Sequence, residues 1–171
     1  MFISIESSSS DLSVALLGKE RLIDRLTVPI KNELSEIIIP TIKNFLTQNG
    51  ISFKDISTLV IGCGPGSFTG IRVVVAAAKG IQISNIYMKV IGINSLAALA
   101  MSALEDAREK NCRYIISSID TKRGDIFAQT FELNNIVKSK FPFSAINEIE
   151  ILEIQNLKNY LLTHKLITKN V

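Results

Sequence analysis

The stretch GPGSFTGIR, residues 64–72, concentrates glycines around a proline between two apolar segments. STLVIGC (57–63) precedes it and VVVAAAKG (73–80) follows it, which is the order strand, loop, helix. Such a loop can bind phosphate, because its backbone comes close to the ligand and the helix N-terminus supplies N–H groups and the positive end of a dipole. A tight turn that sets the packing of the next helix needs the same residues. The sequence favours the structural role and leaves the anion site open.

The known nucleotide-binding fingerprints are absent from this loop. A Walker loop has Lys and then Ser or Thr after its last glycine, whereas Gly70 is followed by Ile71 and Arg72. A dinucleotide fingerprint needs G-x-G-x-x-G, and the spacing of the glycines at 62, 64, 66 and 70 does not fit it. Arg72, one turn into the helix, could reach an anion or form an ion pair at an interface, and the Val and Ala content of the helix favours the interface.

Three carboxylates lie at the ends of predicted strands, where acidic residues in some folds hold Mg²⁺: Glu6, Asp120 and Asp125. Glu6 and Asp120 occupy matching places in two similar openings, so they are the cleft candidates for a paired metal site. The alternative is that each carboxylate hydrogen-bonds its own turn, and the sequence favours that alternative. No metal site is predicted with a single histidine, His164, and two cysteines without ligand spacing, Cys63 and Cys112. Both thiols are expected to fill core space in a reducing compartment.

The periodicity of the first two thirds predicts the order βββαβαβα. Strands are expected at 1–6, 11–17, 19–28, 57–63 and 88–93, and helices at 33–49, 68–84 and 96–108. Pro40 should interrupt the first helix, and Ser95 is placed as the N-cap of the last. An antiparallel meander extended by two strands through helical crossovers is what an RNase H-like or actin-like lobe requires. The fold class is therefore α/β, with residues 1–111 as an N-terminal actin-like lobe.

A second, shorter lobe is predicted for residues 112–171. Strands at 112–121 and 125–133 are joined by a turn that ends at Gly124, so they repeat the opening of the first lobe. Pro142 marks a loop, the segment 146–162 fits a helix, and 165–171 would be a strand. The lobe starts like the first one and is apparently shortened.

Composition limits the class of protein. The chain has 171 residues, 47% of them hydrophobic, and a formal net charge of +3 without a concentrated cationic tract, so charge does not argue for nucleic acid as a direct partner. No apolar run approaches the roughly 20 residues that span a bilayer, and the N-terminus does not resemble a signal peptide. A cytoplasmic protein is expected.

Four stretches together resemble the TsaB (YeaZ) family: GPGSFTGIR, ISIESSSSDLSVALL, IIIP and SSIDTKRGDIFAQTFE. The resemblance covers most of residues 1–135. It implies an actin-like (ASKHA) fold and a pseudoenzyme that supports a catalytic paralogue, TsaD, in making N6-threonylcarbamoyladenosine at position 37 of tRNAs that read codons starting with A. It also implies a homodimer when the chain is alone, a heterodimer with TsaD, and larger assemblies with the ATPase TsaE, so that tRNA is reached indirectly through the complex. No cofactor is assigned to this chain, and ATP with Mg²⁺ in the assembled complex stays open.

The resemblance leads us to place the partner on the first lobe. The glycine loop is expected to shape the interface helix through Gly64, Pro65, Gly66, Ser67, Phe68, Thr69, Gly70 and Arg72. The docking helices are expected to contribute Leu34, Ile38, Ile42, Ile71, Val74, Val75, Ala77, Ala78 and Gly80, although the sequence does not settle which stripe faces the partner. No catalytic residue is predicted.

The sequence departs from the family pattern at three points, and two alternative functions stay open. Glu6 stands where the family usually has Asp, Leu34 stands near a usual His, and the family's second lobe is longer, so the lobe is either naturally short or the chain is a piece. An ATP-binding kinase-like protein would need an adenosine-binding glycine turn in the second lobe. A peptidase of the M22 type would need metal ligands.

Overall fold

A computed structural model describes residues 1–19, 21–31, 33–134, 142–157 and 159–160. The chain divides into two compact units, Met1–Ser95 and a second unit from Leu96 onward. This boundary lies before the one predicted at 111–112, because Leu96, Ala100, Leu104 and Ala107 pack into the core of the second sheet. We describe each unit by itself.

The first unit is built on a five-stranded sheet in the order β3-β2-β1-β4-β5. β1 pairs antiparallel with β2, and β2 pairs antiparallel with β3, whereas β4 runs parallel to both β1 and β5. The alternation of buried and partly exposed side chains along β1 and β2 shows that one face of the sheet carries the core. The strands are β1 Phe2–Glu6, β2 Asp11–Leu17, β3 Leu22–Pro29, β4 Thr58–Gly62 and β5 Lys89–Ile93.

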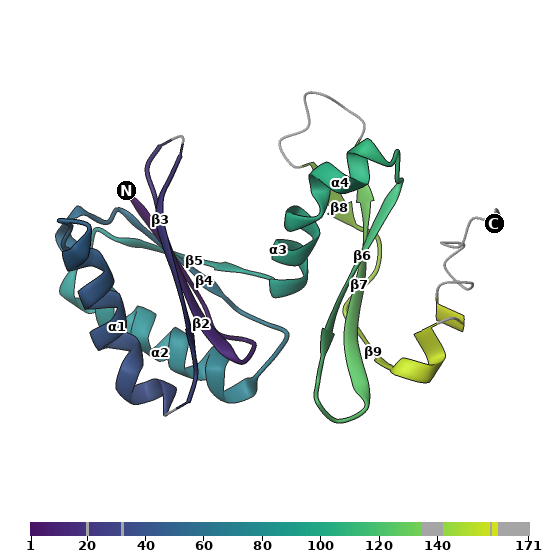
Figure 1. Ribbon diagram of the computed structural model, residues 1–171, viewed down its shortest axis with the longest axis horizontal. Coiled ribbons are helices and arrows are strands. Elements are labelled where there is room, and N and C mark those ends of the chain that lie inside the picture. The colour runs from purple at the N-terminus through teal and green to yellow at the C-terminus, as the bar shows by residue number, and fades with distance from the viewer. Residues whose placement is uncertain (20, 32, 135–141, 158, 161–171) are drawn as a thin grey trace. The chain divides into compact units, whose positions relative to one another are not determined.

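Two helices cover that face, α1 Leu34–Gln48 and α2 Phe68–Ser84 (Figure 1). A 3₁₀ turn, η1 Phe53–Asp55, leads from α1 to β4. The helix α1 runs through Pro40, which lies on its exposed side. A proline removes one backbone donor, and on the exposed side water can satisfy the carbonyl that this leaves without its bond. The predicted order of strands and helices, and with it the actin-like opening of the fold, is confirmed.

The predicted helix over 96–108 forms as two helices, α3 Ser95–Ser102 and α4 Leu104–Glu109. The break lies at Ala103, with φ −93° and ψ 1°. Just before it, the Ser102 hydroxyl donates to the Leu99 carbonyl at 2.7 Å. Serine side chains compete with the backbone for such carbonyls, which is why they tend to stand at helix ends.

The second sheet is centred on β7. β6 pairs with β7 on one side, and both β8 and β9 pair antiparallel with β7, at opposite ends of its length. The strands are β6 Tyr114–Asp120, β7 Asp125–Leu133, β8 Phe143–Ala145 and β9 Glu150–Glu153, followed by the 3₁₀ turn η2 Ile154–Asn156. The helix predicted for 146–162 is therefore wrong over 146–153, which form a loop and β9, and 154–156 form only a 3₁₀ turn. The strand predicted for 165–171 lies outside the described residues.

No helix in the described part of the chain is long and apolar enough to cross a membrane.

Candidate functional site

The glycine loop packs against the chain's own β1–β2 turn. Gly66 and Gly70 face the backbone of Ser8 and Ser7, and a Cβ on Gly70 would overlap the Ser7 carbonyl oxygen. A Cβ on Gly66 would lie 2.5 Å from Ser8 Cβ, and the φ of Gly66 is +151°. The glycines are therefore needed because two loops of the protein come close together there.

Hydrogen bonds join the two loops. The Ser67 N–H donates to the Ser8 carbonyl at 2.7 Å, and the Ser7 hydroxyl donates to the Gly70 carbonyl at 3.1 Å. Ser67 is the N-cap of α2, and its side chain accepts from the Gly70 N–H at 3.2 Å. The start of α2 is thus fixed by the serine turn and by its own cap. Ser7 and Ser8 are buried, so the backbone of the glycine loop is packed against the protein's own turn.

The Glu6 carboxylate also contacts the serine turn and the residues around the glycine loop. It accepts from the Ser8 N–H at 2.6 Å and from the Ser95 hydroxyl at 3.1 Å. It lies over Gly62, where any Cβ would overlap it. The Ser95 N–H donates in turn to the Gly64 carbonyl at 2.8 Å. Glu6 therefore links the serine turn, the end of β4 and the start of α3.

Asp120 has local partners in the β6–β7 turn. One of its oxygens accepts from the Lys122 N–H at 2.7 Å, and the other lies 3.2 Å from the Lys122 ammonium. The backbone hydrogen bond first, and then the side-chain bond, lower the pKa of Asp120. These contacts are those of a turn carboxylate. Glu6 and Asp120 belong to different units, so the structure does not place them as a pair.

Among the described residues, no group of three His, Cys, Asp or Glu side chains could hold a metal ion. His164 lies outside those residues. Cys63 and Cys112 are both exposed, contrary to the prediction that they fill core space. Cys63 comes just after the last residue of β4, and Cys112 lies between α4 and β6, so neither is on a face that packs.

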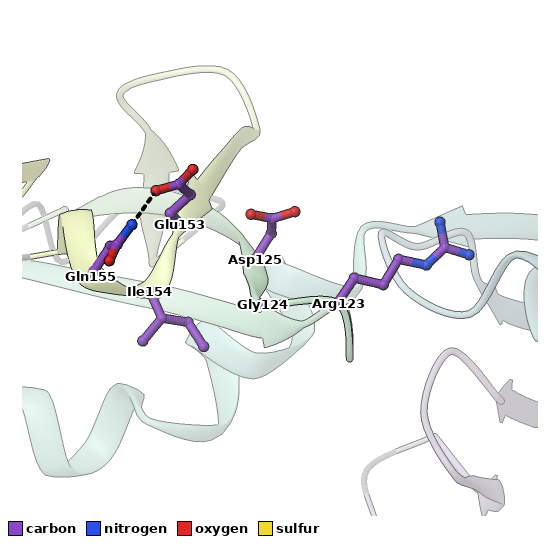
Figure 2. A pocket seen from close by; sticks show the side chains of 6 residues that line it. All are labelled: Arg123, Gly124, Asp125, Glu153, Ile154 and Gln155. Atoms are coloured by element: carbon purple, nitrogen blue, oxygen red, sulfur yellow. Dashed lines mark hydrogen bonds between the residues drawn. The ribbon is translucent and has the colours of Figure 1, made fainter.

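The second unit has a hollow of about 550 Å³ at the β6–β7 turn. It is lined by Arg123, Gly124, Asp125, Glu153, Ile154 and Gln155. Figure 2 shows the Arg123 guanidinium pointing away from the carboxylates of Asp125 and Glu153. Glu153 accepts from the Gln155 amide at 2.6 Å and is thereby held to its own strand end. The hollow brings no convergent set of groups to one point.

The structure divides the predicted docking residues into three groups by exposure. Leu34, Ile38, Ile42, Val74 and Ala78 are buried in the unit's own core, so they do not lie on a docking surface. Ile71, Val75 and Ala77 are half-buried, and Gly80 is exposed. In the glycine loop, the exposed members are Ser67, Phe68, Thr69 and Arg72.

The outward face of α2 is a continuous stripe that the sequence did not single out. We call it the α2 stripe, and its members are Phe68, Thr69, Arg72, Ala76, Lys79, Gly80 and Ile83. They fall within about a third of the helix circumference at 100° per residue. Sequence reasoning missed the stripe because α2 is apolar nearly all round, which leaves the phase of its buried face ambiguous. The Arg72 guanidinium lies over the Phe68 ring, 5.1 Å from its centroid.

Comparison with known proteins identifies the family. The family model described as TsaD, tRNA N6-adenosine threonylcarbamoyltransferase, matches residues 29–146. The tRNA threonylcarbamoyladenosine biosynthesis protein TsaB of Buchnera aphidicola subsp. Acyrthosiphon pisum is 30% identical over 161 residues, which cover 92% of this chain and 71% of that protein. The chain belongs to the TsaB (YeaZ) family.

Other comparisons define how far the likeness extends. The TsaB protein of Escherichia coli K12 is 28% identical over 125 residues, 73% of this chain and 52% of that protein. The chain thus spans about half of the length of that TsaB relative. YeaZ from Pseudomonas aeruginosa, a solved structure, superposes with a TM-score of 0.72 at 21% identity, over 89% of this chain and 67% of that one. This structural likeness supports the TsaB fold.

Proposed function

We propose that this chain acts in the biosynthesis of threonylcarbamoyladenosine in tRNA, as a subunit that binds and supports a TsaD-type transferase and does not itself transfer the group. The observation that carries the proposal is the match to several proteins named for this pathway, over most of the chain. The product would be N6-threonylcarbamoyladenosine at position 37 of tRNAs that read codons starting with A. A TsaE-type ATPase would join the assembly.

The packing of the first unit supports a role without catalysis. The glycine loop is filled by the serine turn, and the Glu6 carboxylate is engaged by Ser8 and Ser95. Both features are thus engaged in contacts within the chain. The outward faces of α1 and α2 are the proposed docking surface for the transferase, because α2 presents the apolar side chains Phe68 and Ile83 to solvent.

A substitution in the middle of the α2 stripe tests the docking surface. Gly80→Glu adds a long charged side chain where nothing lies within 4 Å of a Cβ, so the chain should stay folded. We expect it to lose co-purification with the TsaD paralogue from the same cell, read by size-exclusion chromatography with light scattering. Gly80→Ala is the matched control and should bind normally. Ala77, half-buried against the core, would not serve because its substitution also disturbs packing.

The proposal fails if Gly80→Glu, folded by circular dichroism, binds the paralogue as the unchanged chain does. It fails also if the chain alone, free of TsaD and TsaE, modifies tRNA. Hydrolysis of ATP by the chain alone would favour the kinase-like alternative.

A further inference from the structure

The charged residues of the α2 stripe indicate which charge a partner surface should carry. The two charged members of the stripe, Arg72 and Lys79, are both cationic. The sequence holds no Asp or Glu from residue 56 to residue 104, so α2 and the segments on either side of it supply no compensating carboxylate. On the outward side of α1, Glu36 and Lys43 cancel. The exposed face of the two helices is therefore cationic because of α2.

The stripe has the spacing of a helix-packing seam. Thr69, Arg72, Ala76, Lys79 and Ile83 follow one another at intervals of three and four residues, and the small Ala76 and Gly80 lie at its middle. Small residues allow a second helix to approach closely, and the three-four spacing suits a nearly aligned crossing. Arg72 and Lys79 are seven residues apart, or about 10.5 Å along the axis at 1.5 Å per residue.

Exposed apolar side chains continue from the last turn of α2 into the turn that follows it. Ile83, in the helix, is 80% exposed, and Ile86 and Tyr87, just after it, are 75% and 88% exposed. The turn that carries Ile86 and Tyr87 is held firmly, because the Gln82 amide donates to the Met88 carbonyl and the Asn85 amide donates to two carbonyls, those of Phe53 and Ile56. A backbone that is already held loses little conformational freedom on binding, so large side chains exposed on it suit the role of interface anchors.

A second copy of this chain does not fit the stripe. In an antiparallel pairing about the centre of the stripe, Arg72 lies opposite Lys79 of the second copy, and this happens twice. In a parallel pairing, each cation lies opposite itself. Like charges placed opposite one another oppose association, and more so at low salt. Self-pairing by this face is thus weakened by its own charges.

We propose that the α2 stripe and the 83–87 turn receive a partner helix that bears two carboxylates about two turns apart, with small or apolar residues between them. The proposal rests on the function proposed above and adds the chemistry of the partner surface: acidic, helical and different from this chain. The homodimer that the family resemblance implies is then the weaker complex, and it strengthens as salt rises, whereas the partner complex weakens.

The first experiment needs no TsaD protein, so it is independent of the proposed function. Arg72→Glu/Lys79→Glu reverses the stripe, and Lys19→Glu/Arg25→Glu, at exposed positions on the β2–β3 hairpin, is the control with the same change in net charge. We expect native mass spectrometry at low salt to show a one-to-one complex when the unchanged chain is mixed with the stripe variant. Mixing the unchanged chain with the control variant should not form this one-to-one complex. The charge selection is overturned if the unchanged chain, the stripe variant and the control variant self-associate equally, and if mixing the unchanged chain with the stripe variant forms no additional complex.

The second experiment uses the TsaD paralogue of the same cell. The stripe variant should bind it about tenfold more weakly than the unchanged chain, since exposed charge pairs each contribute modestly, and the loss should shrink as salt is raised. Unchanged affinity in the stripe variant while Gly80→Glu abolishes binding would overturn the charge inference and leave the proposed function standing. No binding by the unchanged chain would overturn the proposed function instead.

Two other occupants give distinct results. Sedimentation of the unchanged chain with anionic phospholipid vesicles, lost in the stripe variant, would assign the cationic apolar face to a membrane and overturn the proposal. Dimers of the unchanged chain that grow stronger as salt is lowered would assign the face to a second copy and overturn it as well.

Discussion

Gly70 and Gly80 stand on one helix in opposite environments, and the contrast shows what the glycine loop is for. Gly70 faces the Ser7 carbonyl, whereas Gly80 faces open space. The glycine at 70 is therefore required by packing, and the glycine at 80 only lowers helix stability. The sequence pattern predicted the loop and favoured its structural role. It could not supply the reason, because the serine turn that fills the loop lies 56 or more residues earlier in the chain.

Alanine substitutions at the two glycines should have opposite effects. Gly70→Ala forces the serine turn away and is expected to lower the free energy of unfolding by about 1–3 kcal/mol, as overpacking does. Gly80→Ala should raise it by roughly 0.5–1 kcal/mol, since alanine loses less backbone entropy in a helix. Urea unfolding followed by circular dichroism measures both. Equal changes in the free energy of unfolding would mean that the serine turn moves away from residue 70 at little energetic cost.

Asp120 and Asp55 should titrate below the usual range for aspartate. A hydrogen bond from the Lys122 N–H is the largest cause that lowers the pKa of Asp120, and one from the Ser52 N–H is the largest that lowers the pKa of Asp55. A carboxyl whose pKa is lower in the folded chain stabilises it above the unfolded pKa of about 3.9. That contribution is lost as the pH falls through the folded pKa.

Carboxyl-detected NMR titration measures these pKa values. Lys122→Ala removes the ammonium but keeps the backbone N–H. We therefore expect the pKa of Asp120 to rise only part of the way to the usual value for aspartate. A full return in this variant would assign the shift to the ammonium instead. Asp55 should not respond to the substitution and serves as the internal reference.

The helix predicted over 146–162 shows where local periodicity fails. In EILE, Glu150 and Leu152 are half-buried while Ile151 and Glu153 are exposed, which is the alternation of a strand. The segment forms β9 because β7 offers it an edge to pair with, in the register Ile126 with Leu152 and Ala128 with Glu150. Four residues are too few for the period of two to outweigh a helical pattern in the sequence. By contrast, the long periodic segments of the first unit were predicted within a few residues of their ends.

The hydrogen bonds of the Tyr160 hydroxyl are expected to stabilise the second unit, and substitution can test this. The hydroxyl lies 3.1 Å from the Thr130 hydroxyl and accepts from the Asn147 amide at 2.8 Å, and the residue is buried in a cluster with Ile126 and Ala128. Tyr160→Phe keeps the ring and removes the acceptor. We expect it to lower the stability of the second unit by about 1–3 kcal/mol, because buried polar groups lose a partner.

Hydrogen exchange at the β7 amides reads this effect locally. Thr130→Val is the matched variant, and combined with Tyr160→Phe it should cost less than the two single changes added together. Additive costs would mean that the two hydroxyls do not interact.

At the scale of the whole chain, two separate cores predict two separate unfolding transitions. The first unit buries one large cluster between its sheet and the helices α1 and α2. The described residues of the second unit form two smaller clusters, one beneath α3 and α4 and one around Ile126 and Tyr160. Stability grows with apolar area removed from water, so the first unit should open at the higher free energy.

Native-state hydrogen exchange in low urea can separate the two units, with core substitutions as markers. Ile42→Ala removes a fully buried side chain from the first core, and Phe131→Ala does the same in the second. Each should cost about 2–5 kcal/mol in its own unit, because it leaves a cavity. We expect the amides of β1 and β4 to respond to Ile42→Ala alone, and those of β6 and β7 to Phe131→Ala alone. If either substitution lowered protection equally across both sheets, the chain would unfold as one cooperative body.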